Sequence, residues 1–154
     1  MRTALTTLAA CLALLPAACS GDAEDDVEAE FVAQVNAICA EYGPKLALIP
    51  PPAVLNDEWA ATGADLADLL EASVNELRLL EAPENVSDQF GDWLALRTEM
   101  TAAMRDVQTA GAALDRPGLE SGLARVDAAI AEADPLAEEL GFADCSPTGV
   151  TTGR

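Results

Sequence analysis

Apolar residues recur every three or four positions from Glu28 onward, which is the spacing of one face of an α-helix. Proline-containing breaks at residues 50–52, 83 and 115–118 divide this pattern into four amphipathic segments. The apolar face of the first segment comprises Phe31, Val35, Ile38, Tyr42, Leu46 and Ile49. That of the second carries Trp59, Thr62, Leu66, Leu70, Ser73, Leu77 and Leu80. The third runs through Val86, Phe90, Trp93, Arg97, Met100, Met104, Val107, Gly111 and Leu114, and the fourth through Leu119, Leu123, Val126, Ile130, Ala133, Ala137 and Leu140.

Short connections between long helices favour antiparallel neighbours, and no alternating strand pattern competes. The sequence therefore predicts an all-α fold, an antiparallel helical bundle of about four helices. Pro44 should kink or break the first helix, and Pro135 should bend the fourth. Asn56 is a good N-cap for the second helix, and Gly141 is suited to end the fourth.

Composition agrees with helix and excludes several kinds of function. Alanine, the strongest helix former, makes up roughly a fifth of the chain, and aromatic residues only 4%. Histidine is absent, so Ser–His and Cys–His nucleophile pairs are excluded. The net charge is −19, and it becomes −20 without residues 1–18, whose one charged residue is Arg2. So acidic a chain repels phosphate backbones and anionic headgroups, which argues against nucleic-acid binding.

The first eighteen residues have the pattern of an export signal. Arg2 supplies a positive start, and residues 4–15 form a mostly apolar run that is too short to span a bilayer, which needs about 20 residues. The small residues Ala17 and Ala18 then precede Cys19, and the chain turns abruptly polar.

Residues 15–19, Leu-Pro-Ala-Ala-Cys, resemble the lipobox of bacterial lipoproteins. The resemblance implies that the thiol of Cys19 receives diacylglycerol and that a peptidase cleaves just before it. Pro16 departs from the pattern, which usually has leucine three residues before the cysteine. A rival match ends at Cys11 but leaves almost no apolar segment before cleavage. Ordinary secretion with cleavage near Ala18 is the competing interpretation.

Export places the remaining two cysteines, Cys39 and Cys145, in an oxidising compartment, where solitary cysteines usually pair. The sequence thus predicts a bundle stapled by one disulfide, with two buried free thiols as the alternative. Because Cys39 lies well inside the first helix, the tail after the fourth helix must fold back by roughly 10 Å or more to reach it.

These features divide the chain into four parts. Residues 1–18 are the expected signal peptide, 19–27 the lipidated cysteine and an acidic disordered tether, 28–146 the helical bundle domain and 147–154 a flexible tail. The order of lipobox, acidic tether, cysteine-bearing first helix and C-terminal cysteine resembles small Ala-rich secreted lipoproteins of high-GC Gram-positive bacteria. That group has no activity to transfer, so the resemblance bears on fold and location alone.

Several residues invite a functional interpretation beside a structural one. Trp59, Trp93 and Arg97 are candidates for a ligand pocket at one end of the bundle, with core packing as the alternative. Met100 and Met104 have the spacing of a copper(I) site, but they also lie on the apolar face of their helix. The carboxylates of the second and fourth segments suit divalent ions, but in so acidic a chain a solvated helix face is the favoured interpretation.

The sequence therefore predicts no catalytic residues, no metal and no cofactor. The expected function is a non-enzymatic binding or interaction module of the cell envelope. It would be held on the outer face of the membrane through Cys19 and would contact an envelope protein. The alternative is a small-ligand or cation-binding accessory protein that uses a pocket between helices.

Overall fold

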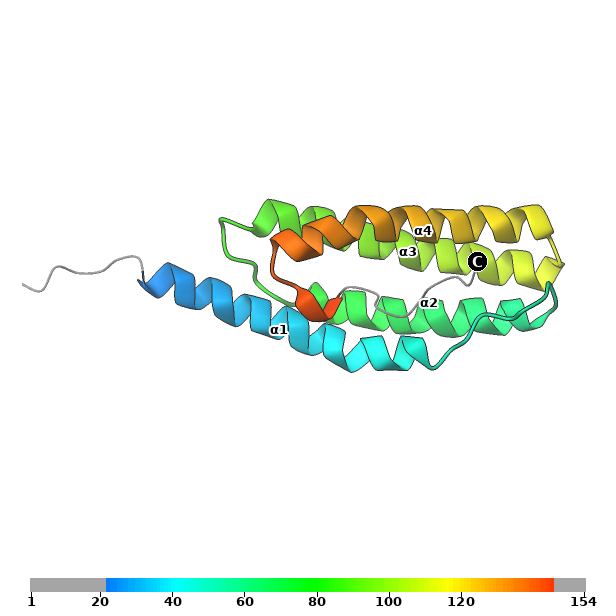
Figure 1. The fold of residues 1–154 in the computed structure, drawn as a ribbon, viewed down its shortest axis with the longest axis horizontal. Coiled ribbons are helices and arrows are strands. Elements are labelled where there is room, and N and C mark those ends of the chain that lie inside the picture. Colours follow the sequence, from blue (N-terminus) through cyan, green and yellow to red (C-terminus); the bar gives the residue numbers. More distant parts are fainter. Residues whose placement is uncertain (1–21, 146–154) are drawn as a thin grey trace, which may run out of the picture.

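The computed structural model describes residues 22–145, with side chains from residue 25. The expected signal peptide, Cys19 and the expected tail 147–154 lie outside the described residues. Within them the fold is all-α, as predicted, and successive long helices run antiparallel (Figure 1). The elements are α1 (Asp22–Ala47), α2 (Glu58–Leu77), α3 (Ser87–Ala113), α4 (Arg116–Glu139) and the short 3₁₀ helix η1 (Ala143–Cys145).

The helices pack unevenly. The backbones of α2 and α4 both lie against α3, whereas α1 lies against α2 and η1. In Figure 1 the chain leaves α4, turns back and places η1 beside α1. The short helix η1 thus contacts α1 and, less extensively, α4.

The apolar faces predicted from the sequence form the core, which has two clusters. One surrounds Phe31, Trp93 and Phe142, and its aromatic rings pack mostly edge to face. The other surrounds Met100, Met104 and Val107 and extends to Trp59. Leu114 is an exception to the predicted face, because it is the left-handed residue that ends α3 and is 57% exposed.

The start and the course of α1 differ from the sequence-based expectation. Residues 22–27 were expected to be a disordered tether, but α1 begins at Asp22. Acidic residues near a helix N-terminus are favoured by its partial positive charge, and this outweighs the repulsion expected to extend the segment. Of the two outcomes expected at Pro44, a kink or a break, the break does not occur, since α1 continues to Ala47. Pro44 cannot donate a hydrogen bond to the carbonyl of Ala40, and Ala40 is an exposed residue.

The start of α2 also differs from the prediction. The residue that precedes the helix is Asp57, and it makes no side-chain capping hydrogen bond. Asn56 lies one residue earlier, and its Nδ2 donates to a carboxylate oxygen of Glu58 at 2.9 Å. The expectation that Asn56 caps the helix is therefore wrong, because its amide bonds a side chain of the first turn and not a backbone N–H.

The end of α4 explains how the tail folds back. Gly141 adopts a left-handed conformation, with φ of 74°. The N–H of Phe142 donates to the carbonyl of Ala137 at 2.8 Å, and that of Gly141 to Glu138 at 3.2 Å, which together form a Schellman motif. Gly141 therefore ends the helix as predicted, and the reversal directs η1 towards α1.

Helices α2 and α3 approach closely at two glycines. A Cβ added to Gly63 would lie 2.6 Å from the backbone nitrogen of Gln108, and one added to Gly111 would lie 2.6 Å from that of Ala60. Both contacts are with backbone atoms of the facing helix, so a side chain at either position would push the helices apart.

We expect Gly111→Ala to lower the free energy of unfolding by about 1–3 kcal/mol, because the added methyl overpacks a helix contact that has no room for it. Gly91→Ala in the same helix is the matched control, since nothing lies within 4 Å of its added Cβ. The free energy of unfolding of this control should rise by about 0.5–1 kcal/mol, because alanine has a higher helix propensity than glycine. Urea unfolding measures both, and equal changes in the two variants would contradict the close contact.

Candidate functional site

The predicted disulfide is present. Cys39 on α1 and Cys145 on η1 are bonded, and both residues are buried. The side chain of Asn36 secures the same junction, because its Nδ2 donates to the carbonyl of Gly141 and its Oδ1 accepts from the N–H of Asp144, each at 3.1 Å. The bond therefore joins the first helix to the segment that follows the last.

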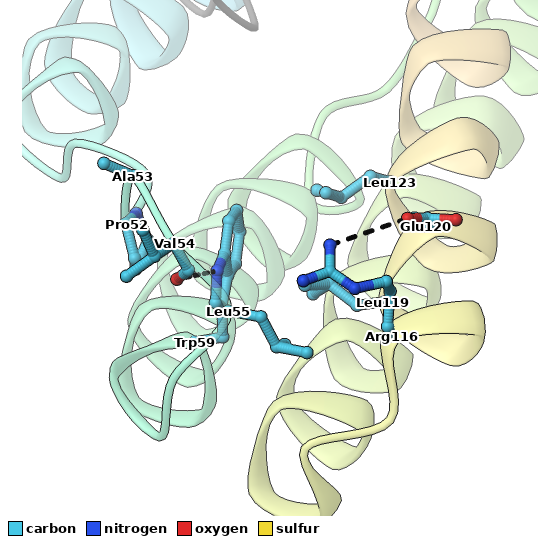
Figure 2. A pocket seen from close by; sticks show the side chains of 9 residues that line it. All are labelled: Pro52, Ala53, Val54, Leu55, Trp59, Arg116, Leu119, Glu120 and Leu123. Carbon is cyan, nitrogen blue, oxygen red and sulfur yellow. Dashed lines mark hydrogen bonds and ion pairs between the residues drawn. The ribbon is translucent and has the colours of Figure 1, made fainter.

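A cavity of about 340 Å³ opens between the α1–α2 connection and the start of α4. Figure 2 shows Val54 and Trp59 on one side of this opening and Arg116 and Glu120 on the other. The residues that line it are Pro52, Ala53, Val54, Leu55, Trp59, Arg116, Leu119, Glu120 and Leu123. In Figure 1 this site lies at the end of the bundle opposite the start of α1.

The walls of the cavity are largely apolar and its rim is charged. The indole N–H of Trp59 donates to the carbonyl of Val54 at 3.1 Å, so the polar atom of this ring is already used and holds the connection in place. At the rim, a guanidinium nitrogen of Arg116 lies 3.9 Å from a carboxylate oxygen of Glu120, and both side chains are about two-thirds exposed. A contact this long and exposed is weak, so both charges remain available to a partner.

The structure does not bring the three candidate ligand-binding residues together. Trp59 lines the cavity, whereas Trp93 and Arg97 lie elsewhere. Each tryptophan lies near the start of its helix, and because α2 and α3 are antiparallel, the two helix starts lie at opposite ends of the bundle. The expectation that both tryptophans line one pocket is therefore wrong.

Arg97 is buried beside Trp93, with its guanidinium carbon 5.6 Å from the ring centroid. Its Nε has no hydrogen-bond partner among the described residues. Burial lowers the pKa of Arg97, and the charge of Asp134 on α4 opposes this effect. Burial likewise raises the pKa of Asp134, against the opposing charge of Arg97. The arrangement places Arg97 inside the core.

Two other pairs of candidate residues make structural contacts in the part of the chain described. Met100 and Met104 are buried in the second core cluster. Asp68 and Glu71 on α2 both accept from Arg105 on α3, at 2.6 and 2.9 Å. No group of three metal-ligating side chains occurs between residues 22 and 145. Among the same residues, no helix is both long and apolar enough to cross a membrane.

The residues that form the cavity were not singled out by the sequence, Trp59 excepted. Val54 and Leu55 belong to a proline-rich connection, while Leu119 and Leu123 have the spacing of core positions in the fourth segment. Their meeting depends on how the connection crosses the end of the bundle. No local pattern indicates this contact.

Tyr42 offers a direct test of the α1–α2 contact. Its hydroxyl donates to a carboxylate oxygen of Glu76 at 2.6 Å, and this bond, together with burial, raises the pKa of Tyr42 from 10.0 to about 12. Since the folded-state pKa lies above the unfolded value, the associated stability is present below pH 10 and is lost as pH rises through 12.

We expect the phenolate absorbance of the folded protein to appear near pH 12, and near pH 10 in denaturant. The chain has one tyrosine, so the signal is unambiguous. Glu76→Gln should lower the pH at which Tyr42 is half ionised, because the substitution removes the negative charge that disfavours the phenolate. A folded-state midpoint equal to the denatured one would show that this hydrogen bond is absent.

No protein-family model matches the chain, and comparisons with curated proteins and with solved structures give no significant match.

Proposed function

We propose that this chain is a lipid-anchored extracytoplasmic binding module, with Cys19 as its membrane attachment. The resemblance of residues 15–19 to a lipobox supports the anchor, and the Cys39–Cys145 disulfide is typical of proteins from oxidising compartments. As a module of this kind it would act by contact with an envelope partner, without catalysis.

The position of the cavity is the observation that carries this proposal. Helix α1 has 26 residues, so it extends about 39 Å from the end nearest Cys19. The cavity lies at the far end of the bundle from the start of α1 (Figure 1). A chain attached to lipid at Cys19 would thus present this cavity away from the membrane, where another molecule can reach it.

A small-ligand-binding accessory protein is the second candidate. It is favoured by the cavity volume of about 340 Å³, which lies at the lower end of the range of ligand pockets. In this case the same lining residues would surround the ligand, and Arg116 or Glu120 would orient its polar group.

Membrane attachment is tested by fractionation of the producing cells and intact mass measurement. We expect wild-type protein in the membrane fraction, with a mass that starts at Cys19 and includes diacylglyceryl. Cys19→Ser should abolish that modification. Cys11→Ser is the matched control within the signal segment and should change neither the mature mass nor the fractionation. Lipid attachment that survives Cys19→Ser would refute the proposed anchor.

A further inference from the structure

We propose that the cavity between the α1–α2 connection and the start of α4 receives an apolar side chain from a basic segment of a partner protein. This inference rests on the proposed binding function and names the partner chemistry of the same site. It follows from the apolar walls of the cavity, the exposed apolar residues of the connection and the charge around the opening.

The apolar part of the site is suited to one side chain. Leu55, Leu119 and Leu123 contribute hydrocarbon surface, and the ring of Trp59 has its one polar atom bonded to Val54. An aliphatic group placed here would leave water without requiring a new hydrogen bond.

The surroundings favour a protein over a small molecule. Val54 lines the cavity yet remains 66% exposed. A ligand of cavity size would leave such apolar surface in water, whereas a protein segment that crosses the opening covers it.

The charges around the opening and on the whole chain favour a basic partner. Glu120 lies at the rim, and the exposed carboxylates Glu58 and Asp115 are adjacent in sequence to lining residues. Arg116 is the cation among the lining residues, and its 3.9 Å contact with Glu120 is loose enough to be exchanged for a basic group of the partner. The strong negative charge of the chain attracts such a segment and opposes association with a second copy.

The test uses the mature protein in detergent and three synthetic peptides: Ac-KKLKK-NH₂, Ac-KKGKK-NH₂ and Ac-EELEE-NH₂. The chain has two tryptophans, so fluorotryptophan labelling gives two fluorine NMR signals, which Trp93→Phe assigns. Trp59 lines the cavity, whereas Trp93 is 1% exposed in the other core cluster and serves as an internal control.

We expect Ac-KKLKK-NH₂ to shift the Trp59 signal and leave that of Trp93 unchanged. Ac-KKGKK-NH₂, which lacks the leucine, should bind more weakly by about tenfold or more. Ac-EELEE-NH₂, in which the charge is reversed, should bind more weakly still at low salt. Val54→Asn should reduce the response. Leu79→Asn is the matched control, because Leu79 is also a largely exposed apolar residue but lies in the α2–α3 connection.

Equal binding of the leucine-free or the acidic peptide would overturn the proposal, as would equal shifts of both tryptophans or no shift at millimolar peptide. Lipid attachment at Cys19 is measured separately by mass and fractionation. Failure of peptide binding is therefore distinguishable from failure of the proposed anchored module.

Discussion

Replacing both Cys39 and Cys145 with alanine should lower the free energy of unfolding by about 4–5 kcal/mol. The two residues are 106 positions apart, so the bond restricts a long loop of the unfolded chain. Such a loss is comparable with the whole stability of many single domains. Urea unfolding of the oxidised wild type and of the double variant measures the difference.

The loss should be concentrated at α1. This helix contacts α2 and η1, and η1 is joined to it by the disulfide and by Asn36. We therefore expect amide exchange to accelerate more in α1 than in α3, which packs between two helices. Reductant should destabilise the wild type and leave the double variant unchanged; a wild type insensitive to complete reduction would contradict this account.

Trp93→Ala should lower the free energy of unfolding by about 3–5 kcal/mol. Its side chain is 1% exposed, and its ring centroid lies 5.1 Å from that of Phe142 and 6.0 Å from that of Phe90. Truncation would leave a void enclosed by α1, α3 and the segment after α4. It would also remove the ring that covers the buried guanidinium of Arg97.

Trp59→Ala is the comparison that separates core packing from cavity lining. Trp59 borders an open cavity, so water can occupy the space left by its ring and the expected loss is smaller than for Trp93. Thermal or urea unfolding of the two variants tests this order. Equal losses would indicate that both rings are enclosed to the same extent.

The sequence by itself determined the helices and most of their buried faces. Helical periodicity is a local property, and residues such as Val35, Leu77, Val107 and Val126 are buried because each lies on the apolar side of its own helix. The end of α4 was also predictable locally, since Gly141 favours the left-handed conformation that terminates it. The disulfide followed from cysteine number and the expected compartment.

The local sequence pattern did not determine the start and the course of α1, because competing effects of similar size act there. The start of α1 at Asp22 depends on whether helix-end electrostatics outweigh repulsion among acidic residues. Continuation through Pro44 depends on whether solvent reaches the carbonyl of Ala40. A disordered tether was expected up to residue 27 and a kink or a break at Pro44, whereas α1 is helical from Asp22 and continues past Pro44 to Ala47.

Only the tertiary structure decided which distant surfaces meet. The close approach of α2 and α3 gives Gly63 and Gly111 their role, and the antiparallel arrangement separates Trp59 from Trp93. The cavity forms because the α1–α2 connection crosses the bundle end beside α4, far away in sequence. Periodicity specifies which side of a helix is buried but not which helix covers it, and this pairing is set by packing across the whole bundle.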